Sequence, residues 1–257
     1  MAAVLSTAMA ATMLLTGSIS VQAADAAAAN DPAVELIFTS VSVSGDSHTE
    51  AMYEFADKVE ELSGGSVTCK CYDNGSLFSS ENEFDALLNG DADLAYISFP
   101  TIATQIPSYS MFASGYLFSS YEHMTSVLNG DIGLNKIRPQ IEETLNIKPL
   151  SSFYLGSRVI NTREKEINSY DDMNGLLLRM PNSEAWLFLG EALGANPTPL
   201  SFSELYTALQ TGAVDAQDNP LPSIESAKFY EVTKYIAITN HVVTPSCHVS
   251  TVTHGTA

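Results

Sequence analysis

The chain has 257 residues, of which 30 are acidic and 11 are Lys or Arg, so its formal net charge is −19. Hydrophobic residues make up 45% and charged residues 16% of it, which is typical of a globular protein and argues against a disordered one. The acidic excess argues against nucleic acid and anionic membrane surfaces as partners, and an anionic ligand would need a local basic site.

The first 23 residues carry no charge and end in the small-x-small pattern Val21-Gln22-Ala23. An apolar run followed by such a pattern resembles the hydrophobic region and cleavage site of a secretory signal. We therefore expect an export signal at 1–23 and an alanine-rich linker at 24–32. The mature protein is then expected to be periplasmic or otherwise extracytoplasmic.

From residue 33 the pattern alternates strands and helices. Ser47 is expected to cap an amphipathic helix whose apolar positions follow the 3.6-residue period and which ends at Gly64-Gly65. A shorter helix ends at Asn89-Gly90. Strands are predicted at 34–43, 67–72 and 93–100. This β-α-β-α-β order predicts a parallel sheet with ligand contacts outside the carboxyl ends of its strands.

After a less regular stretch, the second half of the chain again alternates strands and helices. Residues 101–121 are predicted as loop with helical turns, and 148–161 as a strand pair or one long bent strand. Ser201 is expected to cap a helix, with Glu204 at the capping-box position. Further elements are predicted as helices at 121–130, 132–145 and 183–193, and as strands at 175–180, 212–217 and 240–245. We therefore expect two α/β domains: 33–155 together with 244–257, and 156–243.

An enzyme is one alternative, because residues 45–48 read Gly-Asp-Ser-His directly after a strand. This resembles the nucleophile block of one hydrolase family, which supplies its base from an Asp-x-x-His block. None of the five histidines has an acidic residue three positions before it. A serine nucleophile needs such a base, so a helix cap explains Ser47 more simply.

A metal site is not predicted either. The candidate ligands His241, Cys247, His248 and His254 are spaced in a way that matches no common zinc pattern. Cys69 and Cys71 share one face of a predicted strand, which favours small buried thiols over a disulfide between them. We expect neither a metal nor another cofactor.

Arginine is rare in this chain, and three of its four arginines lie between residues 158 and 179. Arg179 sits at the carboxyl end of the predicted strand 175–180, where open α/β folds bind ligands. A guanidinium group matches a carboxylate with a fork of donors, so a partly buried arginine needs an anion nearby. The anion could be a ligand, or it could be Asp215 or Asp218 in a structural salt bridge.

Residues 179–241 resemble the DctP-like solute-binding proteins of tripartite ATP-independent periplasmic (TRAP) transporters, which are receptors for organic acids. Residues 55–77 and 89–98 are similar to the first helix, second strand and third strand of that family. The resemblance implies a periplasmic-binding-protein-like α/β fold, with two domains around a ligand cleft. Its motifs in this chain are Leu-Gly-Ala-x-Pro-Thr-Pro at 193–199, Phe-Ser-Glu-x-Tyr at 202–206, Leu-Gln-x-Gly-x-Val-Asp at 209–215 and Gln-x-Asn-Pro at 217–220.

The resemblance also implies roles for particular residues. Arg179 falls on the arginine that binds the ligand carboxylate, and Asn219 on the asparagine that completes this site. Arg158 matches a second cleft arginine, expected to take another anionic or hydroxyl group, whereas Arg163 matches no binding position. The implied ligand-binding residues are Arg179, Asn219, Arg158, Phe202, Asn182 and Ser98, of which Phe202 and Asn182 line the pocket and Ser98 bears on selectivity.

We therefore expect a receptor, not an enzyme, that captures a dicarboxylate or sugar acid and delivers it to the membrane subunits of a TRAP transporter. A ligand-sensing domain for signalling and a secreted hydrolase are the alternatives. Family members normally continue for several dozen residues beyond the position matching residue 245. The resemblance thus implies that part of the first domain and hinge is missing from this chain.

Overall fold

The computed structural model describes residues 33–251, so the predicted export signal and linker lie outside the described residues. In the first domain β1 (Val34–Thr39) pairs in parallel with both β2 (Val67–Tyr72) and β3 (Leu94–Ser98). The helices α1 (Ser47–Leu62) and α2 (Glu83–Asn89) connect these strands. The predicted parallel sheet is therefore confirmed.

Two predicted caps are wrong. Asp46, not Ser47, is the N-cap of α1, because its carboxylate accepts a hydrogen bond from the His48 backbone N at 2.9 Å. Ser201 makes no capping hydrogen bond, and a 3-10 turn, Phe202–Glu204, separates it from α7 (Leu205–Thr211). The tertiary structure explains the second error, because the Ser201 hydroxyl donates to the Glu81 carboxylate instead.

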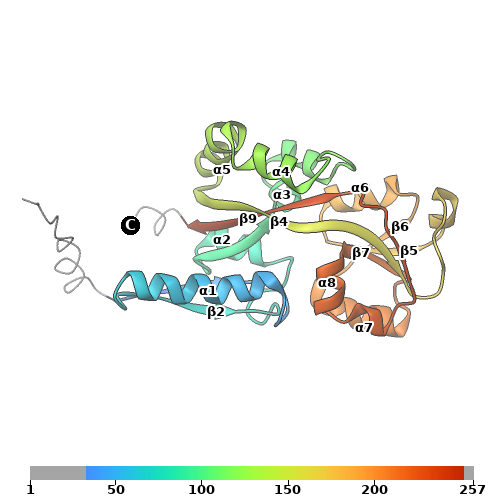
Figure 1. Ribbon diagram of the computed structural model, residues 1–257, viewed down its shortest axis with the longest axis horizontal. Coiled ribbons are helices and arrows are strands. Elements are labelled where there is room, and N and C mark those ends of the chain that lie inside the picture. The colour runs from blue at the N-terminus through green and yellow to red at the C-terminus, as the bar shows by residue number, and fades with distance from the viewer. Residues whose placement is uncertain (1–32, 252–257) are drawn as a thin grey trace, which may run out of the picture.

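Two long strands join the domains. β4 (Ile147–Thr162) is one continuous strand, not a pair, and β9 (Val243–Thr251) runs antiparallel to both β4 and β3. Figure 1 shows both strands passing from one domain to the other. At Gly156, where the register shifts, φ is +139° and an added Cβ would lie 2.3 Å from the Pro220 Cβ. Only glycine fits there without a clash.

The second domain has a parallel sheet of its own. β5 (Leu177–Met180) pairs in parallel with β6 (Asn196–Pro199) and β7 (Ala216–Pro220), and the far half of β4 pairs antiparallel with β7. The short β8 (Tyr235–Ala237) lies on the other edge of β4. The full strand order is β2-β1-β3-β9-β4-β7-β5-β6.

The remaining helices cover these sheets. Figure 1 shows α4 and α5 on the side of the first domain opposite to α1. The remaining α-helices are α3 (Phe99–Ile102), α4 (Tyr121–Leu128), α5 (Arg138–Leu145), α6 (Glu184–Ala192) and α8 (Leu221–Ser226). Other helical segments, of 3-10 or π type, span Pro107–Ala113, Gly133–Ile137, Tyr170–Met173 and Phe229–Glu231. Among residues 33–251, none of the helices combines the length and apolar character that a membrane span requires.

Each domain buries its own apolar clusters. In the first, Phe99 and Ile141 pack against β9 residues such as Val249. In the second, Trp186 and Leu178 form the centre of another cluster. Burying each large apolar side chain contributes roughly 1.5–3 kcal/mol, so each domain has a core of its own. The exact boundaries, 33–155 with 244–257 and 156–243, stay a prediction.

Candidate functional site

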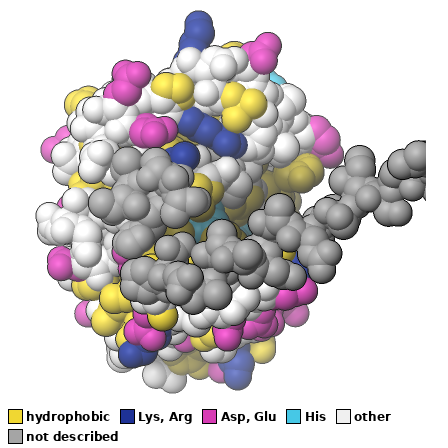
Figure 2. Space-filling view, turned by 90° about the vertical axis from the view of Figure 1, so that its left-hand side faces the viewer, with side chains coloured by type: hydrophobic (Ala, Val, Ile, Leu, Met, Phe, Trp, Pro, Cys, Tyr) yellow, Lys and Arg dark blue, Asp and Glu magenta, His cyan; other side chains and the backbone are white. Residues whose placement is uncertain are grey.

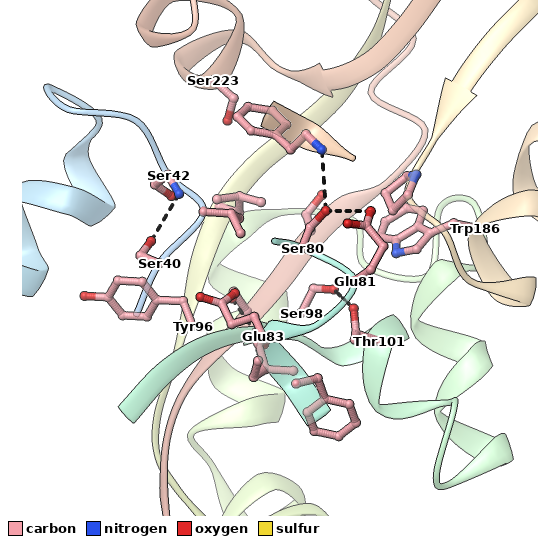
Figure 3. Close-up of a pocket in the computed structure, with 18 of the residues that line it drawn as sticks. Ser40, Ser42, Ser80, Glu81, Glu83, Tyr96, Ser98, Thr101, Trp186 and Ser223 are labelled. Atoms are coloured by element: carbon pink, nitrogen blue, oxygen red, sulfur yellow. Dashed lines mark hydrogen bonds between the residues drawn. The ribbon is translucent and has the colours of Figure 1, made fainter. Parts of the chain in front are cut away.

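A cavity of about 410 Å³ lies between the two domains. The first domain contributes the loop after β1, the start of α1, the segment 80–85 and the end of β3. The second contributes residues at the carboxyl ends of β5 and β7, as the strand order predicts. Figure 3 shows side chains of both domains around this space. All six residues implied by the resemblance line it: Ser98, Arg158, Arg179, Asn182, Phe202 and Asn219.

Arg179 lies on β5 and is only 2% exposed. Its Nε donates a hydrogen bond to the Leu200 carbonyl oxygen at 2.7 Å, and its guanidinium carbon lies 6.0 Å from the Phe202 ring centroid. Burial, reinforced by the neighbouring positive charge of Arg158, lowers the pKa of Arg179 to about 10. A guanidinium in this environment gains most from an anion that reaches it through the cavity.

The structural salt bridge considered for Arg179 is formed by Arg158 instead. Arg158 Nε lies 2.8 Å from Asp218 Oδ2, and its Nη2 lies 2.9 Å from Asp218 Oδ1. Asp215 uses its carboxylate to accept from the Leu177 backbone N at 3.0 Å. Among the described residues, no carboxylate pairs with Arg179.

Asp218 is fully buried and is held from two sides. Besides Arg158, His241 Nε2 lies 3.2 Å from Asp218 Oδ2. Burial alone would raise the pKa of Asp218, but the charge and hydrogen bonds of Arg158, with those of His241, hold it at about 2. The indole of Trp186 covers Arg158, with the guanidinium carbon 4.4 Å from the ring centroid. Arg158 is therefore fixed in place and its charge is already matched.

The amide of Asn219 belongs to the same network. Its Oδ1 accepts from Arg158 Nη2 at 3.3 Å, and its Nδ2 donates to Gln217 Oε1 at 2.6 Å. Ser98, on the opposite domain, shares a 2.8 Å hydrogen bond with the Thr101 hydroxyl. The structure thus brings together the residues that the resemblance selected, although their contacts with a ligand stay a prediction.

Sequence reasoning missed the acidic wall that the first domain presents to the cavity. Asp46, Glu81, Glu83 and Asp85 line it. Two of them reach across the cleft: Ser201 donates to the Glu81 carboxylate, and Ser226 donates to Asp46 Oδ2 at 3.1 Å. These contacts hold the two domains together over the cavity. No sequence motif marks them, because they depend on the arrangement of two separate domains.

The hydrolase alternative gains no support from the geometry. Ser47 is exposed and does not line the cavity. The neighbouring His48 directs its Nδ1 to Asp46 Oδ1 at 3.0 Å. Within residues 33–251, no histidine is hydrogen-bonded to Ser47, and no group of His, Cys, Asp and Glu side chains is arranged to hold a metal ion. His254, one of the considered ligands, lies outside the described residues.

Comparison with known proteins identifies the family. Residues 38–251 match the family model DctP, described as bacterial extracellular solute-binding protein, family 7. The chain belongs to this family. The sialic acid-binding periplasmic protein SiaP of Vibrio cholerae is 36% identical over 188 residues, which cover 73% of this chain and 58% of that protein. The chain thus spans somewhat more than half the length of this DctP-family relative.

Solved structures of the DctP family agree with the fold described above. A TRAP periplasmic solute binding protein from Roseobacter denitrificans, with bound 3-deoxy-D-manno-oct-2-ulosonic acid, is 39% identical. Its TM-score is 0.81, over 86% of this chain and 72% of that one. The sugar acid binding protein DctPAm from Advenella mimigardefordensis, in complex with galactonate, has 32% identity and a TM-score of 0.82, with 87% and 72% covered. The expected fold is therefore confirmed.

Proposed function

We propose that this protein is the extracytoplasmic receptor of a TRAP-type transporter and that it binds a small organic acid between its two domains. The observation that carries the proposal is the Arg179 guanidinium, which lines the cavity, is almost fully buried and has no carboxylate partner among the described residues. A carboxylate ligand would supply the missing counter-charge.

The energetics favour this role for Arg179. Each charge-assisted hydrogen bond to a ligand carboxylate contributes roughly 1.5–3 kcal/mol. Removing one partner of such a desolvated pair costs about 3–5 kcal/mol, which would abolish useful binding. Arg158, paired with Asp218, serves mainly to hold the Asn219 amide and the cavity wall in place. Phe202 and Asn182 form the side walls, and Ser98 contributes to selectivity from the first domain.

The relatives support an organic acid as the ligand class. The proteins described above bind sialic acid, 3-deoxy-D-manno-oct-2-ulosonic acid and galactonate, each of which carries a carboxylate. The first two are described as periplasmic binding proteins, which favours transport over a signalling role for the same kind of cavity. Delivery to membrane subunits and export by residues 1–23 belong to this proposal.

A thermal-shift screen of the purified chain tests the proposal. The panel contains sugar acids and dicarboxylates, each matched with a neutral polyol of the same carbon skeleton. Because a ligand that binds only the folded state raises the melting temperature, at least one acid should stabilise the protein and its neutral partner should not. Stabilisation by acids and polyols alike, or by neither, would contradict the proposal.

A further inference from the structure

The cavity has opposite electrostatic character at its two walls. Its two lining arginines, Arg158 and Arg179, both come from the second domain. The lining residues of the first domain include acids but no Lys or Arg. Figure 2 looks at the first-domain end of the molecule and shows that acidic side chains, with a few basic ones among them, are also scattered over its outer surface. A ligand in the cavity therefore has a basic wall on one side and an acidic wall on the other.

Glu83 differs from the other three acids of this wall, of which Asp85 is exposed. Asp46 already accepts from His48 and Ser226, and Glu81 already accepts from Ser80 and Ser201. Glu83, at the start of α2, lines the cavity although it is only 4% exposed, and the Thr39 hydroxyl is the one hydrogen-bonding group that lowers its pKa. A carboxyl group offers more acceptor positions than one hydroxyl fills, so a ligand group can use the remaining ones.

Glu83 also lies outside the influence of the two arginines. Burial raises the pKa of Glu83 to about 8, and only a hydrogen bond with the Thr39 hydroxyl, not an arginine charge, acts against this. By contrast, the pKa of Asp218, beside Arg158, is held at about 2. Figure 3 shows Glu83 and Tyr96 among the side chains that the first domain contributes to the cavity. The ligand group that meets Glu83 is therefore not the carboxylate that Arg179 binds.

We propose that Glu83 is a specificity-determining residue: it recognises a hydroxyl group at the end of the ligand remote from its carboxylate and makes the cavity reject a second carboxylate there. This inference rests on the proposed function, because it takes Arg179 as the carboxylate anchor. It narrows the ligand to a hydroxylated monocarboxylate and excludes dicarboxylates of the same length.

The chemistry of the two ligand groups explains the discrimination. A hydroxyl group both donates and accepts, so it pairs with Glu83 whether that side chain is protonated or ionised. A carboxylate can pair only with protonated Glu83, and it would add a negative charge to a wall that already carries Glu81 and Asp46. Arg158 cannot relieve this repulsion, because Asp218 already matches its charge. A buried site binds a ligand much more weakly when the ligand brings an unpaired or like-charged group into it.

Matched pairs of aldonates and aldarates test the inference. Galactonate and galactarate share a carbon skeleton and differ only at C6, which is a CH₂OH group in one and a carboxylate in the other; gluconate and glucarate form a second pair. By isothermal titration at pH 9, above the pKa of about 8 of Glu83, the best-bound aldonate should bind at least about 100-fold more tightly than its aldarate. Equal affinity for the two members of the pair would overturn the inference.

Variants of Glu83 then locate the effect. Glu83→Gln should reduce the aldonate preference at least tenfold, because the amide can donate to a carboxylate and carries no charge. Glu83→Leu should weaken the aldonate at least tenfold. Asp91→Asn, which neutralises an exposed acid that follows the same helix and does not line the cavity, should leave the ratio within threefold. A ratio that stays the same in Glu83→Gln would contradict the role of Glu83.

The outcomes separate this inference from the proposed function. If aldonates and aldarates bind equally well and both need Arg179, the receptor function stands and the role of Glu83 is wrong. If no acid of either class binds, both the carboxylate site and the selectivity built on it fail. If a Glu83 variant does not fold, the ratio of aldonate to aldarate affinity in the wild type decides the inference.

Discussion

Replacing Asp218 by Asn should lower the free energy of unfolding by about 3–5 kcal/mol, because it leaves Arg158 buried without a counter-charge. The side chains of this pair are only 3% and 0% exposed, so solvent screens the interaction little. The amide keeps the size of the carboxylate and part of its hydrogen bonding. The expected loss is therefore electrostatic and does not come from a cavity.

The pH dependence of this loss has a definite sign. The pKa of Asp218 falls from its ordinary 3.8 to about 2 in the folded protein. Its stabilisation is complete above pH 3.8 and is lost as the pH drops to about 2, which amounts to about 2 kcal/mol. Burial lowers the pKa of His248 from its ordinary 6.5 to about 4. The stability linked to His248 is therefore lost at higher pH, as the pH drops from 6.5 to about 4, and this loss should be the same in Asp218→Asn.

Urea denaturation followed by circular dichroism, at pH 7 and at steps down to pH 2.5, measures both effects. The exposed pair Lys234–Glu164 is the control, because its side chains are 59% and 64% exposed. Glu164→Gln should leave the free energy of unfolding close to that of the wild type at any pH, because solvent screens this exposed pair. If Asp218→Asn is no less stable than Glu164→Gln at pH 7, the assigned role of the buried network is wrong.

Two further variants test the hinge and the contacts across the cleft. Gly156→Ala should lower the free energy of unfolding by about 1–3 kcal/mol in urea denaturation, because φ is +139° and the new Cβ would clash with Pro220. A free energy of unfolding within about 0.5 kcal/mol of the wild type would contradict this. Ser201→Ala removes the hydrogen bond to Glu81 and should weaken acid binding three- to tenfold in calorimetric titration without changing stability by more than about 1 kcal/mol. Unchanged affinity would mean that this contact does not stabilise the closed domains.

Much of the fold could be predicted because local periodicity and topology act in the same direction. The 3.6-residue pattern of α1 and the alternation of strands and helices predict the parallel sheets. The carboxyl ends of parallel strands meet at one edge, so Arg179 on β5 and Asn219 on β7 come together. The family motifs then select these residues from several polar side chains of similar pattern.

The partner of Arg158 could not be predicted, because it depends on the register between β4 and β7. Val159 lies opposite Asn219 in that ladder, and this pairing brings Arg158 beside Asp218, sixty residues further along the chain. A pattern of hydrophobic residues does not specify which of Asp215 and Asp218 faces an arginine. The structure shows that Asp218 pairs with Arg158, which leaves Arg179 to the cavity.

Glu83 and Ser201 were missed for a similar reason. An acid at the first residue of a helix is ordinarily explained by the helix dipole, and a serine before a helix by capping. Here Glu83 is buried against the cavity, and the Ser201 hydroxyl reaches the opposite domain. Local sequence rules hold for most elements of this chain, but they fail where two domains meet.

The central claim is that Arg179 binds the carboxylate of the ligand. Calorimetric titration of the acid that stabilises the protein most, into wild type, Arg179→Ala and Arg163→Ala, tests it directly. A loss of 3–5 kcal/mol predicts that Arg179→Ala binds at least about 100-fold more weakly. Arg163 does not line the cavity, so Arg163→Ala should change the affinity for the acid by less than threefold. Binding by Arg179→Ala within tenfold of the wild type would contradict the account.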